Sequence, residues 1–175
     1  SWTLTAGNGT KTVNAWFRDT WGNTTPALTP YSDTIGLDAT PPVNGTLTAT
    51  PGAGQIGLSW SGFTDTPSGI GSYKVVFAAG TAPASCATGT TIYSGSDTSY
   101  THTGLSNLTY GYRVCAIDNA ANVSTGVTKS AKPLPSENNA PSGTIVINSG
   151  AEWTKSTAVT LTLTASDDSP PIQMC

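Results

Sequence analysis

Apolar residues recur at every second position along several short stretches of this chain, which is the pattern of β-strands with one buried face. Val13, Ala15 and Phe17 follow this spacing from Lys11 onward, and residues 31–37 form a second such stretch. No long run places apolar residues three and four positions apart, as an amphipathic helix requires. Most stretches end near Gly, Pro, Asn or Asp, which favour turns. The pattern predicts an all-β protein.

The middle of the chain, from about Pro42 to Lys132, predicts the densest set of strands. Turn residues recur there about every 8–12 positions, a spacing typical of a β-sandwich. A segment of this length also suits one sandwich domain. The strands that we predict in it are 45–50, 55–60, 72–78, 90–93, 99–101, 110–117 and 124–131.

Both ends of the chain repeat features of this middle part. Residues 19–23 (Asp-Thr-Trp-Gly-Asn) are echoed 99 positions later by residues 118–122 (Asp-Asn-Ala-Ala-Asn). Residues 56–60 (Ile-Gly-Leu-Ser-Trp) are echoed by residues 159–163 (Val-Thr-Leu-Thr-Leu). A period of about 99 residues is the size of a domain rather than of a solenoid repeat.

The repeat predicts a division into four parts. Residues 1–40 are the C-terminal half of one domain, 41–133 a complete domain, 134–141 a linker, and 142–175 the N-terminal half of another domain. Aligned on the complete domain, about 26 residues are missing between the two halves. We therefore expect neighbouring domains or subunits of the same protein to complete them.

Several residues of the complete domain carry a resemblance to a known family. Trp60 ends an alternating stretch, Tyr73 opens the next apolar one, and Tyr110 leads into a stretch that contains Val114. In these residues, segment 42–132 resembles a fibronectin type III domain. The resemblance implies that Trp60, Tyr73, Tyr110 and Val114 belong to the core, with Tyr110 at the corner that precedes its strand.

The two half-domains carry a second resemblance. Residues 142–145 (Ser-Gly-Thr-Ile) open the last part, and residues 9–13 (Gly-Thr-Lys-Thr-Val) with 33–35 (Asp-Thr-Ile) close the first part. These motifs resemble the two ends of the Ig-like repeats of large bacterial surface proteins. The fold that the two resemblances imply is a tandem array of immunoglobulin-like and fibronectin type III-like β-sandwiches.

Charge and hydropathy exclude two classes of partner. The chain has only seven Lys and Arg residues and a net charge of −3. A basic face for nucleic acid is therefore not expected. The most apolar run, near residues 75–77, is far too short to cross a bilayer, so we expect no transmembrane segment. The low charged fraction of 10% is common in extracellular repeat proteins.

The three cysteines indicate a disulfide rather than a metal site, because the chain has no CxxC pair and a single histidine. Cys115 faces away from the core side of its strand, and Cys86 follows the strand around Phe77, which such sandwiches place beside it. In an oxidising, extracellular compartment we predict a Cys86–Cys115 bridge. Cys175 stays unpaired or pairs outside this segment, within the missing residues or with another chain.

Acidic residues cluster at turns and linkers. One interpretation is calcium held between successive domains, with Asp38 and Asp118 as the first candidates, because calcium binds several oxygen ligands. The simpler interpretation is that these side chains cap turns by accepting hydrogen bonds from nearby backbone. No dense D-x-D-x-D loop is present, and we expect no other cofactor. The residues concerned are Asp19, Asp33, Asp38, Asp65, Asp118, Asp167 and Asp168.

Two exposed aromatic residues could contact sugar or another protein surface. Trp16 is out of phase with the alternating apolar positions, and Trp21 lies in a turn. Aromatic residues at such positions are enriched in interfaces. His102 is expected at the surface, with no nucleophile motif beside it, so we predict no enzyme. The N-x-S/T sites at Asn8, Asn23, Asn44, Asn107 and Asn122 are potential glycan acceptors.

These features favour a structural or adhesive function at the cell surface. We expect a non-catalytic segment of an extracellular multidomain protein, such as a subunit of a bacterial surface fibre or filament, built as a homopolymeric or tandem array. One alternative is a carbohydrate-binding or spacer array of a secreted polysaccharide-degrading enzyme. Another is an adhesin stalk stiffened by calcium.

Overall fold

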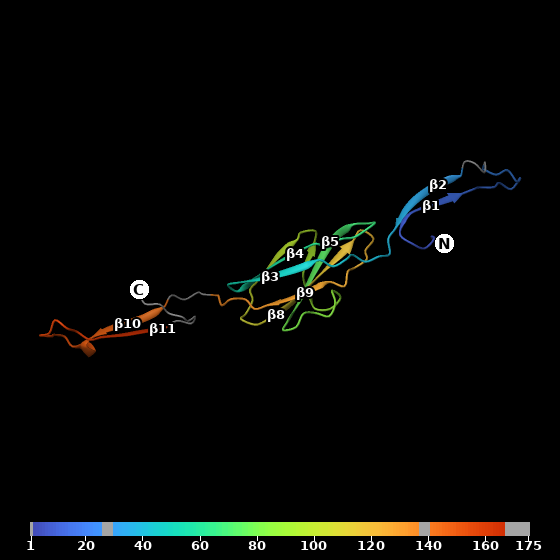
Figure 1. Ribbon diagram of the computed structural model, residues 1–175. Coiled ribbons are helices and arrows are strands. Elements are labelled where there is room, and N and C mark those ends of the chain that lie inside the picture. The colour runs from blue at the N-terminus through green and yellow to red at the C-terminus, as the bar shows by residue number, and fades with distance from the viewer. Residues whose placement is uncertain (1, 26–29, 137–140, 167–175) are drawn as a thin grey trace.

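The structure is a computed structural model that describes residues 2–25, 30–136 and 141–166. Strands dominate this part of the chain, and the one helical element among them is the short 3₁₀ turn η1 (Asn148–Gly150). The all-β prediction is therefore confirmed. Figure 1 shows a central β-sandwich with one two-stranded hairpin on either side of it.

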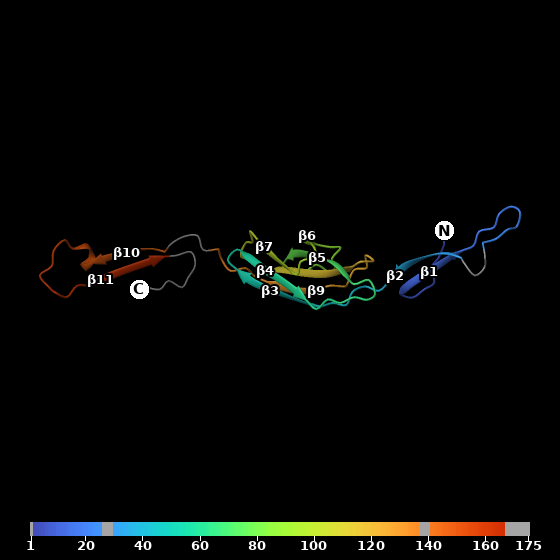
Figure 2. The same cartoon turned by 90° about the horizontal axis from the view of Figure 1, so that it is seen from above.

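The central sandwich consists of two antiparallel sheets that face each other, as Figure 2 shows from above. The first sheet has the strand order β3-β4-β7, with β3 (Thr46–Gly52), β4 (Gln55–Ser61) and β7 (Ser99–Thr103). The second has the order β6-β5-β8-β9, with β5 (Ile70–Ala79), β6 (Thr90–Gly95), β8 (Tyr110–Asp118) and β9 (Val127–Ala131).

The core lies between these sheets because alternate residues of each strand point inward. Ile56, Leu58 and Trp60 of β4 meet Tyr112 and other inward residues of the second sheet. All four of these side chains are at most 3% exposed. The remaining buried members of this cluster are Phe63, Val75, Tyr110, Val114 and Ala116.

Several strand boundaries in the sandwich differ from the prediction by one to three residues, and two of these differences have a local reason. β9 begins at Val127 and not at 124, because Gly126 has a φ of +79°, which interrupts extended backbone. β5 begins at Ile70, two residues before the predicted start at Ser72. A bulge between Ile70 and Ser72 absorbs the extra residue and lets the strand extend further.

The hairpin near the start of the chain pairs β1 (Gly9–Ala15) with β2 (Tyr31–Leu37). The second strand has the predicted bounds. The first strand ends at Ala15, before the predicted Phe17, because the backbone then enters a loop closed by an isolated bridge between Arg18 and Thr24.

The second hairpin pairs β10 (Ser142–Ile147) with β11 (Leu161–Ser166). The sequence pattern of this part predicts strands at 144–148 and 157–165. Asn148 instead has a φ of +47° and ends β10. Its side-chain oxygen accepts a hydrogen bond from the Thr160 amide at 2.8 Å, so regular pairing begins only at Leu161.

Candidate functional site

The loop that follows β8 is built around Asp118. One carboxylate oxygen of Asp118 accepts hydrogen bonds from the amides of Ala120 and Asn122, each at 2.8 Å. The other oxygen accepts one from the side-chain amide of Asn122, also at 2.8 Å. Asp118 is only 4% exposed, so these bonds satisfy a carboxylate that folding has removed from water.

The loop after β1 has the same internal bonds. Asp19 accepts from the amides of Trp21 at 2.9 Å and Asn23 at 2.8 Å, and from the Asn23 side chain at 2.8 Å. The Asn23 side chain is also the main cause that lowers the pKa of Asp19 below its ordinary value. The fourth residue has a positive φ in both loops, at Gly22 and Ala121. The sequence repeat is thus a repeat of local structure.

Asp38, in the linker after β2, connects the Asp118 loop to the β1–β2 hairpin. Its backbone oxygen accepts a hydrogen bond from the Asn122 side chain at 3.1 Å. Its carboxylate accepts from the amide of Ser68 at 3.0 Å and from the side chain of Asn8 at 2.9 Å. Ser68 belongs to the sandwich and Asn8 directly precedes β1, so this one residue bonds to both sides of the junction.

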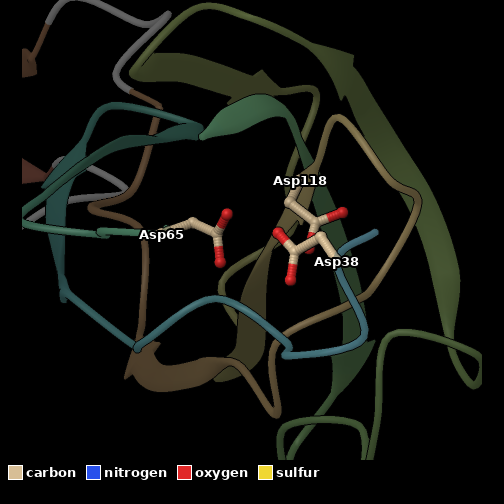
Figure 3. A group of neighbouring side chains, drawn as sticks. All are labelled: Asp38, Asp65 and Asp118. Carbon is tan, nitrogen blue, oxygen red and sulfur yellow. The ribbon is translucent and has the colours of Figure 1, made fainter. Parts of the chain in front are cut away.

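A third carboxylate, that of Asp65, completes the group. Asp65 follows β4 and accepts hydrogen bonds from the Ser68 hydroxyl at 3.2 Å and the Gly69 amide at 2.9 Å. Asp38, Asp65 and Asp118 each place one carboxylate oxygen within 4.8 Å of the others. Figure 3 shows the three carboxylates directed toward one another. We name these three residues the junction cluster.

The junction cluster brings together Asp38 and Asp118, which the sequence suggested as calcium candidates, and adds Asp65. Like charges this close repel each other unless a proton or a cation lies between them. The Ser68 side chain, followed by the Thr40 amide, lowers the pKa of Asp38, which favours its charged form. Oxygen ligands from three carboxylates suit a hard cation such as calcium. In the sequence, Asp65 stands out only as a turn residue two positions before Pro67. Nothing in the neighbouring residues indicates that this turn meets the linker that contains Asp38.

The predicted disulfide is present between Cys86 and Cys115, with an S–S distance of 2.04 Å. Both cysteines lie with Val76 in a small buried cluster on the outer face of the second sheet. The bridge fastens the loop after β5 to the central strand β8. Cys175, Asp167 and Asp168 lie outside the described residues.

The residues assigned to the core by resemblance lie between the two sheets. Trp60, Tyr110 and Val114 are 3%, 8% and 0% exposed, and Tyr73 packs edge-on against Trp60 with ring centroids 5.8 Å apart. The Tyr110 hydroxyl lies 3.0 Å from the hydroxyl of Ser106, four residues earlier. The indole nitrogen of Trp60 is buried without a hydrogen-bond acceptor among the described residues.

His102 is half-buried, whereas we expected it at the surface. It lies on β7 opposite Ile56, and the alternation of that strand turns it inward. Its ring packs against Phe77 with centroids 4.4 Å apart, and its Nδ1 lies 3.1 Å from the Tyr112 hydroxyl. Burial lowers the pKa of His102 and raises that of Tyr112 to about 12.

The tryptophans considered for sugar or protein contact are exposed. Trp16 is 53% and Trp21 is 90% exposed. Trp2 and Trp153 are also exposed, at 78% and 87%, and the sequence pattern did not single them out.

Four of the N-x-S/T asparagines have structural roles. Asn8 donates to Asp38, Asn23 to Asp19, and Asn122 to Asp118. Asn44 donates to the Thr125 hydroxyl at 2.6 Å and accepts from the Gly126 amide at 2.9 Å. Their side-chain amides are therefore already used inside the fold.

The fold and the junction define an all-β protein with a disulfide-bridged sandwich. No model of a known protein family matches the chain, and no curated protein matches it. Among solved structures, chitinase ChiA74 from Bacillus thuringiensis is similar at 21% identity and a TM-score of 0.44, over 63% of this chain and 16% of the chitinase. A β-1,2-glucanase from Parabacteroides distasonis is similar at 24% identity and a TM-score of 0.41, over 65% of this chain and 16% of the glucanase.

Among the described residues, no helix is long and apolar enough to cross a membrane.

Proposed function

We propose that this chain is a non-catalytic, structural segment of an extracellular multidomain protein, in which β-sandwiches are joined by short linkers of defined geometry. Asp38 is the observation that carries the proposal. A freely flexible linker would leave its polar groups to water, whereas the backbone and carboxylate of Asp38 bond to Asn122, Ser68 and Asn8. Such a linker transmits orientation from one unit to the next.

Other features support the same function. The Cys86–Cys115 disulfide suits an oxidising, extracellular compartment. The resemblances to fibronectin type III domains and to Ig-like repeats of bacterial surface proteins are to families that act as spacers and adhesive arrays. The finer proposal is a fibre or filament subunit at the cell surface.

The experiment measures how firmly the linker holds the hairpin. Spin labels at Thr34→Cys on β2 and Thr48→Cys on β3, in a Cys175→Ser background, report the distance between hairpin and sandwich by pulsed electron paramagnetic resonance. Both positions are exposed. We expect a narrow distance distribution that broadens in Asp38→Ala and stays narrow in Asp33→Ala, a matched control on β2. An equally broad distribution in the unsubstituted linker would refute the function proposed here.

A calcium-stiffened stalk is a second candidate, favoured by the convergence of the junction cluster. In this version the cation would bridge the linker residue Asp38 to Asp65 and Asp118 of the sandwich, and it would stiffen the same junction that the hydrogen bonds already define.

Carbohydrate binding within a secreted polysaccharide-degrading enzyme is a third candidate, favoured by the exposure of Trp16 and Trp21. Pull-down on insoluble polysaccharide, with Trp16→Ala and Trp21→Ala against the parent chain, tests it. Retention that both substitutions leave unchanged would remove this candidate.

A further inference from the structure

Each hairpin has one face that carries exposed apolar side chains. On β10–β11, Ile145 pairs with Leu163 and Ile147 pairs with Leu161, so all four side chains lie on the same side. They are 49–61% exposed. Among the described residues no second sheet covers this face. A contiguous apolar face of this kind marks an interaction surface.

The β1–β2 hairpin has a corresponding face, on which apolar side chains lie beside the charged Lys11 and Asp33. Ala15 pairs with Tyr31 and Lys11 pairs with Ile35, and Val13 lies between them on the same side. Ile35 is 57% and Tyr31 is 65% exposed, with the ring of Phe17 packed against Tyr31. The other side of this hairpin carries hydroxyl and amide side chains at Thr10, Thr12, Asn14, Ser32 and Thr34.

The β3–β4 hairpin of the central sandwich matches β10–β11. Leu47 pairs with Trp60 and Ala49 pairs with Leu58. These pairs correspond to Ile145 with Leu163 and Ile147 with Leu161, because residues 159–163 repeat 56–60. The apolar pairs therefore occupy the same places in the two hairpins.

The β8–β9 hairpin matches β1–β2 in the same way. Val114 pairs with Val127 and Tyr110 pairs with Ala131. With the 99-residue offset, Val114 is equivalent to Ala15 and Tyr110 is equivalent to Lys11. In β2, Ala15 pairs with Tyr31 and Lys11 pairs with Ile35. The same offset places Tyr112 on Val13, so Asp33, the partner of Val13, corresponds to Lys129, the partner of Tyr112. Lys129 is exposed, and the charge of Asp33 therefore lies at the rim of the hairpin face.

In the central sandwich these two hairpin types pack face to face. Leu58 and Trp60 belong to one apolar cluster with Tyr110 and Val114, and the partner positions on β3 and β9 pack against it. The fold thus displays how a hairpin like β10–β11 and one like β1–β2 cover each other. Each terminal hairpin carries one half of this interface.

We propose that β10–β11 of one molecule packs on β1–β2 of a second copy of this chain, in the arrangement that β3–β4 and β8–β9 adopt inside the sandwich. The proposal rests on the structural function above and names its partner. The two faces differ, so the contact is head-to-tail and can propagate into an open chain of subunits. The outer edges of β1 and β11, which β5 and β7 occupy in the sandwich, stay open to further strands.

Sedimentation velocity over a range of concentrations tests the proposal, with residues 1–175 carrying Cys175→Ser to exclude disulfide-linked dimers. Leu163→Asp places a charge on the β11 face and Ile35→Asp on the β2 face. Thr162→Asp and Thr34→Asp place the same charge on the opposite sides of these strands. Because all four positions are exposed, the substitutions leave the sandwich core intact.

We expect the Cys175→Ser chain and both threonine controls to form oligomers that grow with concentration. Leu163→Asp and Ile35→Asp should each weaken self-association about 100-fold, since a carboxylate at an apolar contact loses its hydration. An equimolar mixture of these two variants keeps one intact face of each type and should form a 1:1 dimer.

Two results would overturn the proposal. A Cys175→Ser chain that stays monomeric at the highest concentration would show that the faces are covered by something other than a second copy. Self-association of Ile35→Asp alone would show that β10–β11 pairs with itself. Neither result changes the spin-label distances at the linker, so the proposed spacer function is judged separately.

Discussion

Replacing Ala121 by glycine should stabilise the sandwich. Ala121 has a φ of +70°, in the left-handed region, and the equivalent residue of the Asp19 loop is Gly22 with a φ of +89°. A residue with a Cβ pays about 1–2 kcal/mol to adopt this conformation. The greater freedom of glycine in the unfolded chain offsets about 0.4–1 kcal/mol of that gain. The net increase in the free energy of unfolding should be about 0.5–1 kcal/mol.

Urea unfolding followed by near-ultraviolet circular dichroism measures this change, because the buried Trp60 and its tyrosine neighbours report on the sandwich. The melting temperature should rise by about 2–8 °C for a domain of this size. Ala120→Gly is the matched control, since Ala120 precedes it in the same loop and its φ is not positive. It should lower stability. Equal losses in both variants would refute the conformational argument.

Three further predictions concern the histidine, the disulfide and the junction cluster. Folding lowers the pKa of His102, so its contribution to stability is present above the unfolded pKa of about 6.5 and is lost as pH falls through the folded value. The free energy of unfolding, measured from pH 7 to 5, should therefore fall with pH, and His102→Gln should remove this dependence. Replacing Cys86 and Cys115 by alanine should lower the free energy of unfolding by about 3.5 kcal/mol from the closed loop alone, and denaturation with and without reductant checks this against the parent. Under the calcium hypothesis, millimolar calcium should raise the melting temperature of the parent but not of Asp65→Asn, and a melting temperature insensitive to both calcium and chelator would exclude a stabilising ion.

Alternation along the strands was enough to predict most of the sheet structure. The burial of Ile56, Leu58 and Trp60 follows from their spacing, and residues 31–37 form a strand with the predicted bounds. Errors arose where a backbone feature overrides the pattern. The positive φ of Gly126 delays the start of β9, and that of Asn148 ends β10, at points that hydrophobicity does not reveal.

Residues whose environment depends on distant segments were harder to predict. His102 is a polar residue at an inward position, and its contacts with Phe77 and Tyr112 come from the opposite sheet. Asp65 joins Asp38 and Asp118 only because the turn after β4, the linker and the end of β8 meet at one end of the sandwich. Sequence spacing identifies turn residues but does not say which turns meet.

The repeated loop explains why the junction is the part of this molecule that bears on function. Asp118 and Asn122 fold the loop, and the same Asn122 side chain then bonds to the linker residue Asp38. Asp19 and Asn23 make the same internal bonds, so the first loop presents an equivalent asparagine amide. Under the proposed function, that amide would fix the linker that enters its own domain.

The order of the linker should depend on pH through Asp38. Folding lowers the pKa of Asp38, so the hydrogen bonds of its carboxylate persist above the unfolded pKa near 3.8 and weaken as pH falls through the folded pKa. The spin-label distance distribution should therefore stay narrow at neutral pH and broaden only in strong acid, whereas Asp38→Ala should be broad throughout. A distance distribution that broadens already near pH 6 would show that a titratable group other than Asp38 keeps the linker ordered.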